Sequence, residues 1–141
     1  MTDNFRDDGL ELFAEEGPPA LPAGGDTIER EGARVWHASF GEGPAVMLLH
    51  GGMGNSGNFG HQVPALIAAG YRVVVVDSRG QGRSSWDGGA FSYEQFAGDA
   101  LAVLDRLGIG RAAVVGWSDG ACTELAMAKA APERVAGVLF F

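Results

Sequence analysis

The segment AAVVGWSDGACTEL, residues 112–125, decides how the rest of the chain is interpreted. A short apolar run enters Gly116-Trp117-Ser118-Asp119-Gly120, and a helical pattern follows over residues 121–131. This is the G-x-S-x-G pattern between a strand and a helix, in which a sharp turn holds a serine hydroxyl clear of the sheet edge. The N–H groups and dipole of the helix N-terminus favour negative charge that develops there. We therefore predict that Ser118 is a catalytic nucleophile, and the competing interpretation is a serine that only caps the helix.

A second motif, His50-Gly51-Gly52-Met53-Gly54, directly follows the apolar run of residues 45–49. Such a loop can aim a backbone N–H at the oxygen of a tetrahedral intermediate, and the residue after the nucleophile supplies the other donor. Gly52 is the preferred loop donor, Met53 the second choice, and Asp119 the partner donor. His50 and Gly51 are expected to be structural, with the ring of His50 fixing the loop by hydrogen bonds. The alternative is a tight turn without function.

A third motif, DSRGQGRS, covers residues 77–84 and follows the β-branched run of residues 71–76. An uninterrupted apolar run of this kind indicates a strand that is covered on both faces. We expect Asp77 to end the strand and organise the turn, and Arg79 to tie neighbouring loops together. Contact of either side chain with a substrate is the alternative.

The rest of the chain indicates alternating strands and helices. Two strands with a turn at Gly32 are predicted over residues 26–40, a helix over residues 59–69, and a second helix after a Ser92/Gln95 capping box. An apolar strand that we expect to be buried closes the chain at residues 135–141. This order predicts an α/β fold with a mostly parallel sheet and helices on both faces. Residues 1–25, which are acidic and interrupted by Gly and Pro, are predicted to be a flexible extension of the domain at residues 26–141.

The three motifs, in this order and spacing, resemble the α/β-hydrolase superfamily over roughly residues 26–141. The resemblance implies a serine hydrolase that cleaves an ester, an amide or a C–C bond through an acyl-enzyme on Ser118. The elbow sequence G-W-S-D-G is similar to the branch that contains valacyclovir hydrolase, in which Asp119 would pair with a cationic group of the substrate. A carboxylate stabilised by the helix dipole is the simpler interpretation of Asp119, and Trp117 is expected to pack beside the elbow. A serine at the elbow argues against epoxide-hydrolase and haloalkane-dehalogenase chemistry, for which the superfamily uses aspartate.

The chain departs from the family pattern after the elbow. In this fold the catalytic residues follow the order serine, acid, histidine. Beyond Ser118 the carboxylates are Asp119, Glu124 and Glu133, and no histidine follows. We therefore expect a fold that is truncated after about the sixth strand, without the cap domain, and poorly active by itself. A non-catalytic ligand-binding protein on the same fold, or an inactive truncated product, is the alternative.

Composition limits the class of partner. The 141 residues carry a formal net charge of −8, which disfavours nucleic acid and anionic membranes. The sequence has no apolar run of the roughly 18 residues that a membrane span needs, and its polar, acidic first residues lead us to expect no signal peptide. The single cysteine, Cys122, is expected to be a packing residue and suits a cytoplasmic location. We expect a small-molecule acyl substrate and no metal or cofactor, and the sequence leaves the oligomeric state open.

Overall fold

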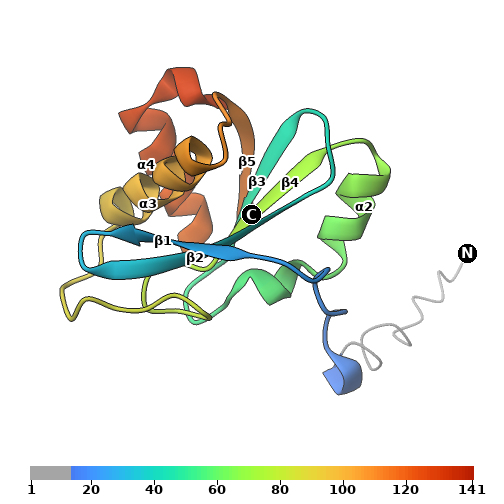
Figure 1. The fold of residues 1–141 in the computed structure, drawn as a ribbon, viewed down its shortest axis with the longest axis horizontal. Helices are drawn as coiled ribbons and strands as arrows, with labels where there is room; N and C mark the ends of the chain where they lie inside the picture. Colours follow the sequence, from blue (N-terminus) through green and yellow to red (C-terminus); the bar gives the residue numbers. More distant parts are fainter. Residues whose placement is uncertain (1–13) are drawn as a thin grey trace, which may run out of the picture.

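The computed structural model describes residues 14–141, which form one six-stranded sheet with helices on both sides (Figure 1). The strands lie in the order β1-β2-β4-β3-β5-β6. Strand β2 pairs antiparallel with β1 and β4, whereas β3 pairs parallel with β4 and β5, and β5 with β6. The strand bounds are β1 Asp26–Arg30, β2 Ala33–Phe40, β3 Ala45–Leu49, β4 Arg72–Val76, β5 Ala112–Gly116 and β6 Val135–Phe140. The predicted α/β class and mostly parallel sheet are confirmed.

The helices are the crossovers between the parallel strands. Segments η1 Ser56–Phe59 and α2 Gln62–Ala68 connect β3 to β4, α3 Tyr93–Arg106 connects β4 to β5, and α4 Asp119–Ala130 with η2 Pro132–Arg134 connects β5 to β6. Helices α3 and α4 cover one face of the sheet, and α2 lies on the other (Figure 1).

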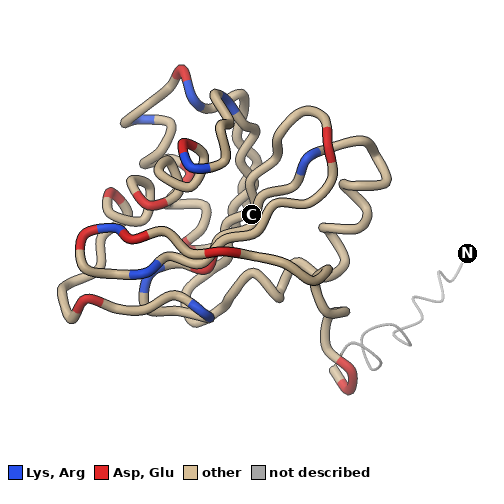
Figure 2. The backbone as a smooth tube through the Cα atoms, viewed as in Figure 1, with Lys and Arg blue, Asp and Glu red and all other residues tan. Residues whose placement is uncertain are grey.

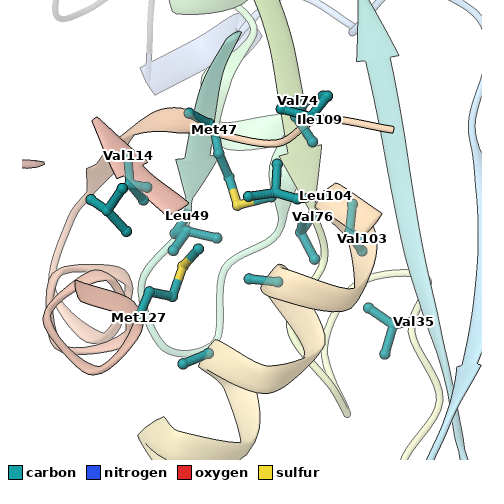
Figure 3. Packing of buried hydrophobic residues seen from close by; sticks show 14 residues of the cluster. Val35, Met47, Leu49, Val74, Val76, Val103, Leu104, Ile109, Val114 and Met127 are labelled. Atoms are coloured by element: carbon teal, nitrogen blue, oxygen red, sulfur yellow. The ribbon is translucent and has the colours of Figure 1, made fainter. Parts of the chain in front are cut away.

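Strand β4 lies between β2 and β3, so its four valines at residues 73–76 are covered by neighbouring strands and helices. All four are at most 3% exposed, and burial of each such side chain stabilises the fold by about 1.5–3 kcal/mol. Val74 and Val76 pack with Met47, Leu49 and residues of α3 and α4 (Figure 3). Val73 and Val75 face the opposite side, where α2 packs. The predicted strand with two covered faces is therefore present.

One helix start differs from the sequence prediction, and a second is as predicted but lacks half of its capping box. The predicted helix over residues 59–69 is interrupted, because the short segment η1, which begins at a reciprocal cap between Asn55 and Asn58, ends at Phe59 with Gly60 as its C-cap. Helix α2 then starts at Gln62. Ser92 caps α3 as predicted, with its hydroxyl accepting from Gln95 N at 3.1 Å. The capping box is incomplete, because Gln95 Oε1 is buried and has no hydrogen-bond partner among residues 14–141.

Strand β6 pairs with β5 among the described residues, and Leu139, Phe140 and Phe141 are 59–70% exposed there. The burial expected from its apolar sequence stays a prediction. Phe141, directly after β6, holds the turn after β5, because Phe141 N donates to Gly116 O and Phe141 O accepts from Ser118 N. Cys122 was misassigned as a packing residue, since it is exposed on α4.

Charged side chains are spread over the outer loops and helices rather than along the central strands (Figure 2). The longest described helix, α3, has 14 residues, and no helix within residues 14–141 has the length and apolarity needed to cross a bilayer.

Glu124 on α4 is a buried acid without a compensating partner. The side chain is 0% exposed, and neither carboxyl oxygen has a hydrogen-bond partner among residues 14–141. Burial raises the pKa of Glu124 to about 7, and the nearby backbone of Gly116 opposes this only in part. The folded protein therefore holds a proton there that the unfolded chain releases near its ordinary pKa of 4.5.

This burial predicts a pH-dependent loss of stability. Unfolding releases the Glu124 proton between about pH 4.5 and pH 7, so the stabilisation is complete below that window and is lost as the pH rises through it. The free energy of unfolding should fall by about 3 kcal/mol more in the wild type than in Glu124→Gln between pH 4 and pH 8, measured by urea denaturation. The exposed Glu133→Gln is the control, and identical pH profiles for wild type and Glu124→Gln would contradict the prediction.

Candidate functional site

Ser118 occupies a strained turn between β5 and α4. Its φ of 53° and ψ of −120° lie outside the regions that residues with a side chain normally adopt. Hydrogen bonds hold this geometry: Ser118 N donates to Phe141 O at 3.0 Å, and Trp117 N donates to Leu49 O at 3.2 Å. The side chain is exposed at the carboxyl edge of the sheet. This is the backbone that the sequence motif requires of an elbow serine, and its role as nucleophile stays a prediction.

The two motif glycines are needed for close backbone approach, not for a positive φ. A Cβ on Gly116 would lie 2.4 Å from the backbone carbonyl of Gly120. A Cβ on Gly120 would fall on the carbonyl group of Leu49, at the end of β3. The glycines thus let α4 begin directly against two strand ends, and Ser118 itself adopts the unusual backbone conformation.

The glycine-rich loop lies against the elbow. Gly54 N donates to Gly51 O at 3.1 Å, which closes a turn with a left-handed Met53 at φ 61°. A Cβ on Gly51 would lie only 3.0 Å from Ser118 Cβ, so the two motifs are in contact. Within residues 14–141, the N–H groups of Gly52, Met53 and Asp119 have no hydrogen-bond acceptor. These unpaired donors beside Ser118 are the arrangement expected of an oxyanion hole.

Asp119 connects the elbow to two other segments. Its Oδ1 accepts from the hydroxyl of Tyr93 at 2.8 Å. Its Oδ2 lies so close to Gly52 that a Cβ there would be 2.3 Å away. The hydrogen bond to Asp119, together with the charge of Asp119, raises the pKa of Tyr93 to about 12, so this phenol is the donor at neutral pH. The sequence analysis missed Tyr93, and its position next to the Ser92 cap gives no local sign of this contact.

His50 is a structural residue with both ring nitrogens in use. The side chain is 1% exposed, and Nε2 accepts from Ser78 N at 2.9 Å. Because Nε2 is the acceptor, Nδ1 carries the proton and donates to Gly51 O at 2.7 Å. Burial holds the pKa of His50 below its usual value, despite the opposing contact with the Gly51 carbonyl. His50 therefore ties the glycine-rich loop to the loop after β4 as a neutral ring.

Asp77 organises the loop after β4 from a fully buried position. Oδ1 accepts from Ser56 N at 2.8 Å, and Oδ2 accepts from Arg83 N at 2.8 Å and Arg83 Nε at 2.9 Å. Burial alone would raise the pKa of Asp77, but the hydrogen bonds from Arg83 and Ser56 outweigh it and hold the pKa below its usual value. Arg83 also lies 3.2 Å over the ring of Trp36.

Arg79 is fully buried and uses all five of its N–H donors. Nε and Nη2 bind the two carboxylate oxygens of Asp99 at 3.0 and 2.9 Å, and Nη1 binds Asp87 at 2.7 Å. The remaining donors reach the backbone carbonyls of Arg30 and Glu31. The pKa of Arg79 is raised, chiefly by the hydrogen bond to Asp99. The arrangement ties the loop after β4 to α3 and to the β1–β2 turn, with no donor left for a substrate.

Two adjoining cavities lie beside the elbow and share Asp119, Gln81 and Phe91. One, of about 340 Å³, reaches the first turn of α3, with Tyr93 and the buried ring of Phe96 in its wall. The other, of about 570 Å³, is bordered by the glycine-rich loop. Ser118 lines neither cavity, whereas its neighbour Asp119 lines both.

The three histidines of the chain, His37, His50 and His61, all precede Ser118 in the sequence, and His61 lies at the start of α2. His37 lies on β2, which β4 and β3 separate from β5, and both nitrogens of His50 are engaged elsewhere. Residues 119–141 contain no histidine. Among residues 14–141 there is also no group of three or more His, Cys, Asp or Glu side chains placed to hold a metal ion.

Comparison with known proteins yields consistent similarities. A family model described as alpha/beta hydrolase fold matches residues 44–140. Epoxide hydrolase B of Mycobacterium tuberculosis is 44% identical over 100 residues, which cover 70% of this chain and 28% of that protein. The 2-hydroxy-6-oxononadienedioate/2-hydroxy-6-oxononatrienedioate hydrolase of Burkholderia vietnamiensis is 45% identical over 107 residues, 72% of this chain and 37% of that protein.

Solved structures agree. Est816, described as an N-acyl homoserine lactone degrading enzyme, has a TM-score of 0.79 and 33% identity, and the match covers 82% of this chain and 44% of that one. A putative epoxide hydrolase from Pseudomonas aeruginosa also has a TM-score of 0.79 at 33% identity, with 86% and 42% covered. The chain therefore spans less than half the length of each of these proteins. Similarity to epoxide hydrolases is notable because the sequence analysis disfavours that chemistry for a serine elbow.

The close packing at the elbow predicts that one added methyl group strongly lowers the stability of the fold. In Gly120→Ala the added Cβ would strike the backbone of Leu49 and His50, which cannot move without disturbing β3. We expect the free energy of unfolding to fall by about 2–3 kcal/mol, measured by urea denaturation. Gly110→Ala is the matched control, since its Cβ would enter open space. Equal stabilities of the two variants would contradict the close approach at the elbow.

Proposed function

The chain belongs to the α/β-hydrolase fold family, and on that premise we propose that it is part of a serine hydrolase that cleaves an ester, an amide or a C–C bond. The observation that carries the proposal is the strained, exposed Ser118 with unpaired N–H donors beside it. A serine that merely caps α4 would bond the helix N-terminus, but the Ser118 side chain makes no capping hydrogen bond.

In the proposed mechanism Ser118 Oγ attacks the acyl carbon of the substrate. The carbonyl oxygen takes up the negative charge, and the N–H groups of Asp119 and of Gly52 or Met53 donate to it. Collapse of this intermediate expels the leaving group and leaves an acyl-enzyme, which water then hydrolyses. A general base has to accept the Ser118 proton and return it to the leaving group. We expect the base and its acid partner beyond residue 141, because residues 119–141 contain no histidine.

Epoxide hydrolysis is the second candidate, favoured by the 44% identity with epoxide hydrolase B. A carboxylate that opens an epoxide forms an ester, which water can cleave to release the diol. A serine oxygen that opens an epoxide forms an ether, which water does not cleave at neutral pH. With serine at position 118, covalent catalysis can complete its cycle on an acyl substrate, whereas reaction with an epoxide would leave the serine blocked as an ether.

The cavities support a small acyl substrate. Their walls combine the rings of Phe91, Tyr93 and Phe96 with the carboxylate of Asp119. Pairing of Asp119 with a cationic substrate group stays a prediction, and the carboxylate already has one partner in Tyr93. The cytoplasmic location and the absence of a nucleic-acid partner also remain predictions.

A base located beyond residue 141, as proposed, predicts that this chain has weak activity and that an external base restores it. We expect the folded 141-residue chain to accelerate p-nitrophenyl acetate hydrolysis by no more than about 10³–10⁴-fold over buffer. Because Ser118 is exposed, added imidazole should raise the serine-dependent rate in proportion to its concentration. Intact mass should show an acetyl group on the protein.

Two variants serve as controls for this assay. Ser118→Ala measures the background from imidazole itself, and Cys122→Ala excludes acetylation of the exposed thiol one turn along α4. Equal rates in wild type and Ser118→Ala would remove Ser118 as the nucleophile. Full enzymatic rates without imidazole would place a base within the chain.

A further inference from the structure

The hydrogen bond between Tyr93 and Asp119 has no part in the proposed mechanism, and its position beside the elbow suggests a separate role. The Tyr93 hydroxyl, at the start of α3, donates to Asp119 Oδ1 at 2.8 Å, at the start of α4. We infer that Tyr93 is a positioning residue that holds the Asp119 carboxylate off the N–H groups of the glycine-rich loop, so that these donors stay open for the oxyanion. The inference rests on the proposed function for its catalytic meaning, and on geometry alone for the restraint.

Asp119 is a strong competitor for the donors beside it. A carboxylate accepts hydrogen bonds from N–H groups more strongly than a neutral carbonyl oxygen does. Oδ2 already lies next to the Cα of Gly52, and the N–H groups of Gly52 and Met53 have no acceptor within residues 14–141. Short acidic side chains readily bond nearby backbone N–H groups when they are free to rotate. Without a restraint, the carboxylate would therefore occupy the donors that the reaction needs.

Tyr93 is well placed to provide the restraint. Ser92 caps α3 immediately before it, and its ring packs edge-on against the buried ring of Phe96 at 6.5 Å. Phe96 in turn contacts Phe91 at 5.6 Å. The raised pKa keeps the phenol protonated, so it donates to Asp119 throughout the neutral range.

The pair is not needed to hold the two helices together. Helices α3 and α4 share the large buried cluster through Ala97, Ala100, Leu104 and Met127. The Tyr93 side chain, by contrast, belongs to a residue that is 41% exposed at the mouth of the cavity. A hydrogen bond in such a place adds little to global stability. We therefore expect Tyr93→Phe to unfold within about 2–3 °C of the wild type.

The first measurement tests the hydrogen bond itself. The chain has two tyrosines, so Tyr71→Phe leaves Tyr93 as the one tyrosine whose ionisation appears in the absorbance at 295 nm. Tyr93 should remain mostly protonated at pH 11, in line with a pKa of about 12, and should be largely ionised at that pH when Asp119→Ala is added. Ionisation that is independent of Asp119 would overturn the pairing.

The second measurement tests the restraint by amide hydrogen exchange in ¹⁵N NMR spectra. In Tyr93→Phe the released carboxylate of Asp119 should accept a hydrogen bond from the N–H of Gly52 or Met53. This bond should slow amide exchange at that residue by at least about tenfold. The double variant Tyr93→Phe/Asp119→Ala should exchange as fast as the wild type, because the competitor is gone. Tyr71→Phe is the control for loss of a phenol hydroxyl elsewhere. Unchanged exchange in Tyr93→Phe would overturn the positioning role.

The third measurement, the rate of imidazole-dependent acylation of Ser118, tests whether the restraint on Asp119 matters for the reaction. Tyr93→Phe should lower this rate about tenfold, whereas Tyr71→Phe should leave it unchanged. An unaltered rate in Tyr93→Phe, with slowed amide exchange, would show that Tyr93 restrains Asp119 and would overturn the proposal that this restraint supports catalysis. A wild-type chain without any serine-dependent rate would count against the proposed function, and the exchange data would still decide whether Tyr93 restrains Asp119.

Discussion

The structure depends on one close contact, in which α4 starts directly against the ends of β3 and β5. Gly116 and Gly120 make this possible, because a side chain on either would strike backbone atoms. The resulting sharp turn forces Ser118 into a conformation that a residue with a side chain normally avoids, at a cost of order 1–3 kcal/mol. Two hydrogen bonds to Phe141 and the packing of α4 over β3 and β5 hold it there. The unusual backbone of Ser118 is thus maintained by its surroundings rather than by the conformational preference of the residue.

Buried polar contacts give the surrounding loops the same rigidity. Arg79, on the loop after β4, has a partner for each of its five N–H donors, and the carboxylate of Asp77 accepts hydrogen bonds that fold the same loop around it. Neutral His50 then joins this loop to the glycine-rich loop. Removing any one partner would leave a buried polar group unpaired, which is costly in a medium of low dielectric constant. These residues therefore act on the candidate site by fixing loops, without facing it.

The chemistry at the site follows from the electrostatics of its edge. In the proposed mechanism, the N–H groups at the start of α4 and in the glycine-rich loop, which have no acceptor among residues 14–141, favour a developing oxyanion, and we infer that the nearby carboxylate of Asp119 opposes it. The hydroxyl of Tyr93 offers Asp119 another partner. In the proposed mechanism, the serine at position 118 would separate this chain chemically from its epoxide-hydrolase relatives, because water cleaves a serine ester but not a serine ether.

The sequence by itself determined the strands, the crossovers and the elbow, because these depend on local signals: the valine run at residues 73–76, the Ser92 cap and the glycine spacing around Ser118. It did not reveal that Glu124 is buried without a hydrogen-bond partner among residues 14–141, or that Tyr93 reaches Asp119. Those features depend on which segments the strand order β4-β3-β5-β6 brings together. Residues 26 positions apart have no shared periodicity from which such a contact could be read, so only the packed sheet and helices decide it.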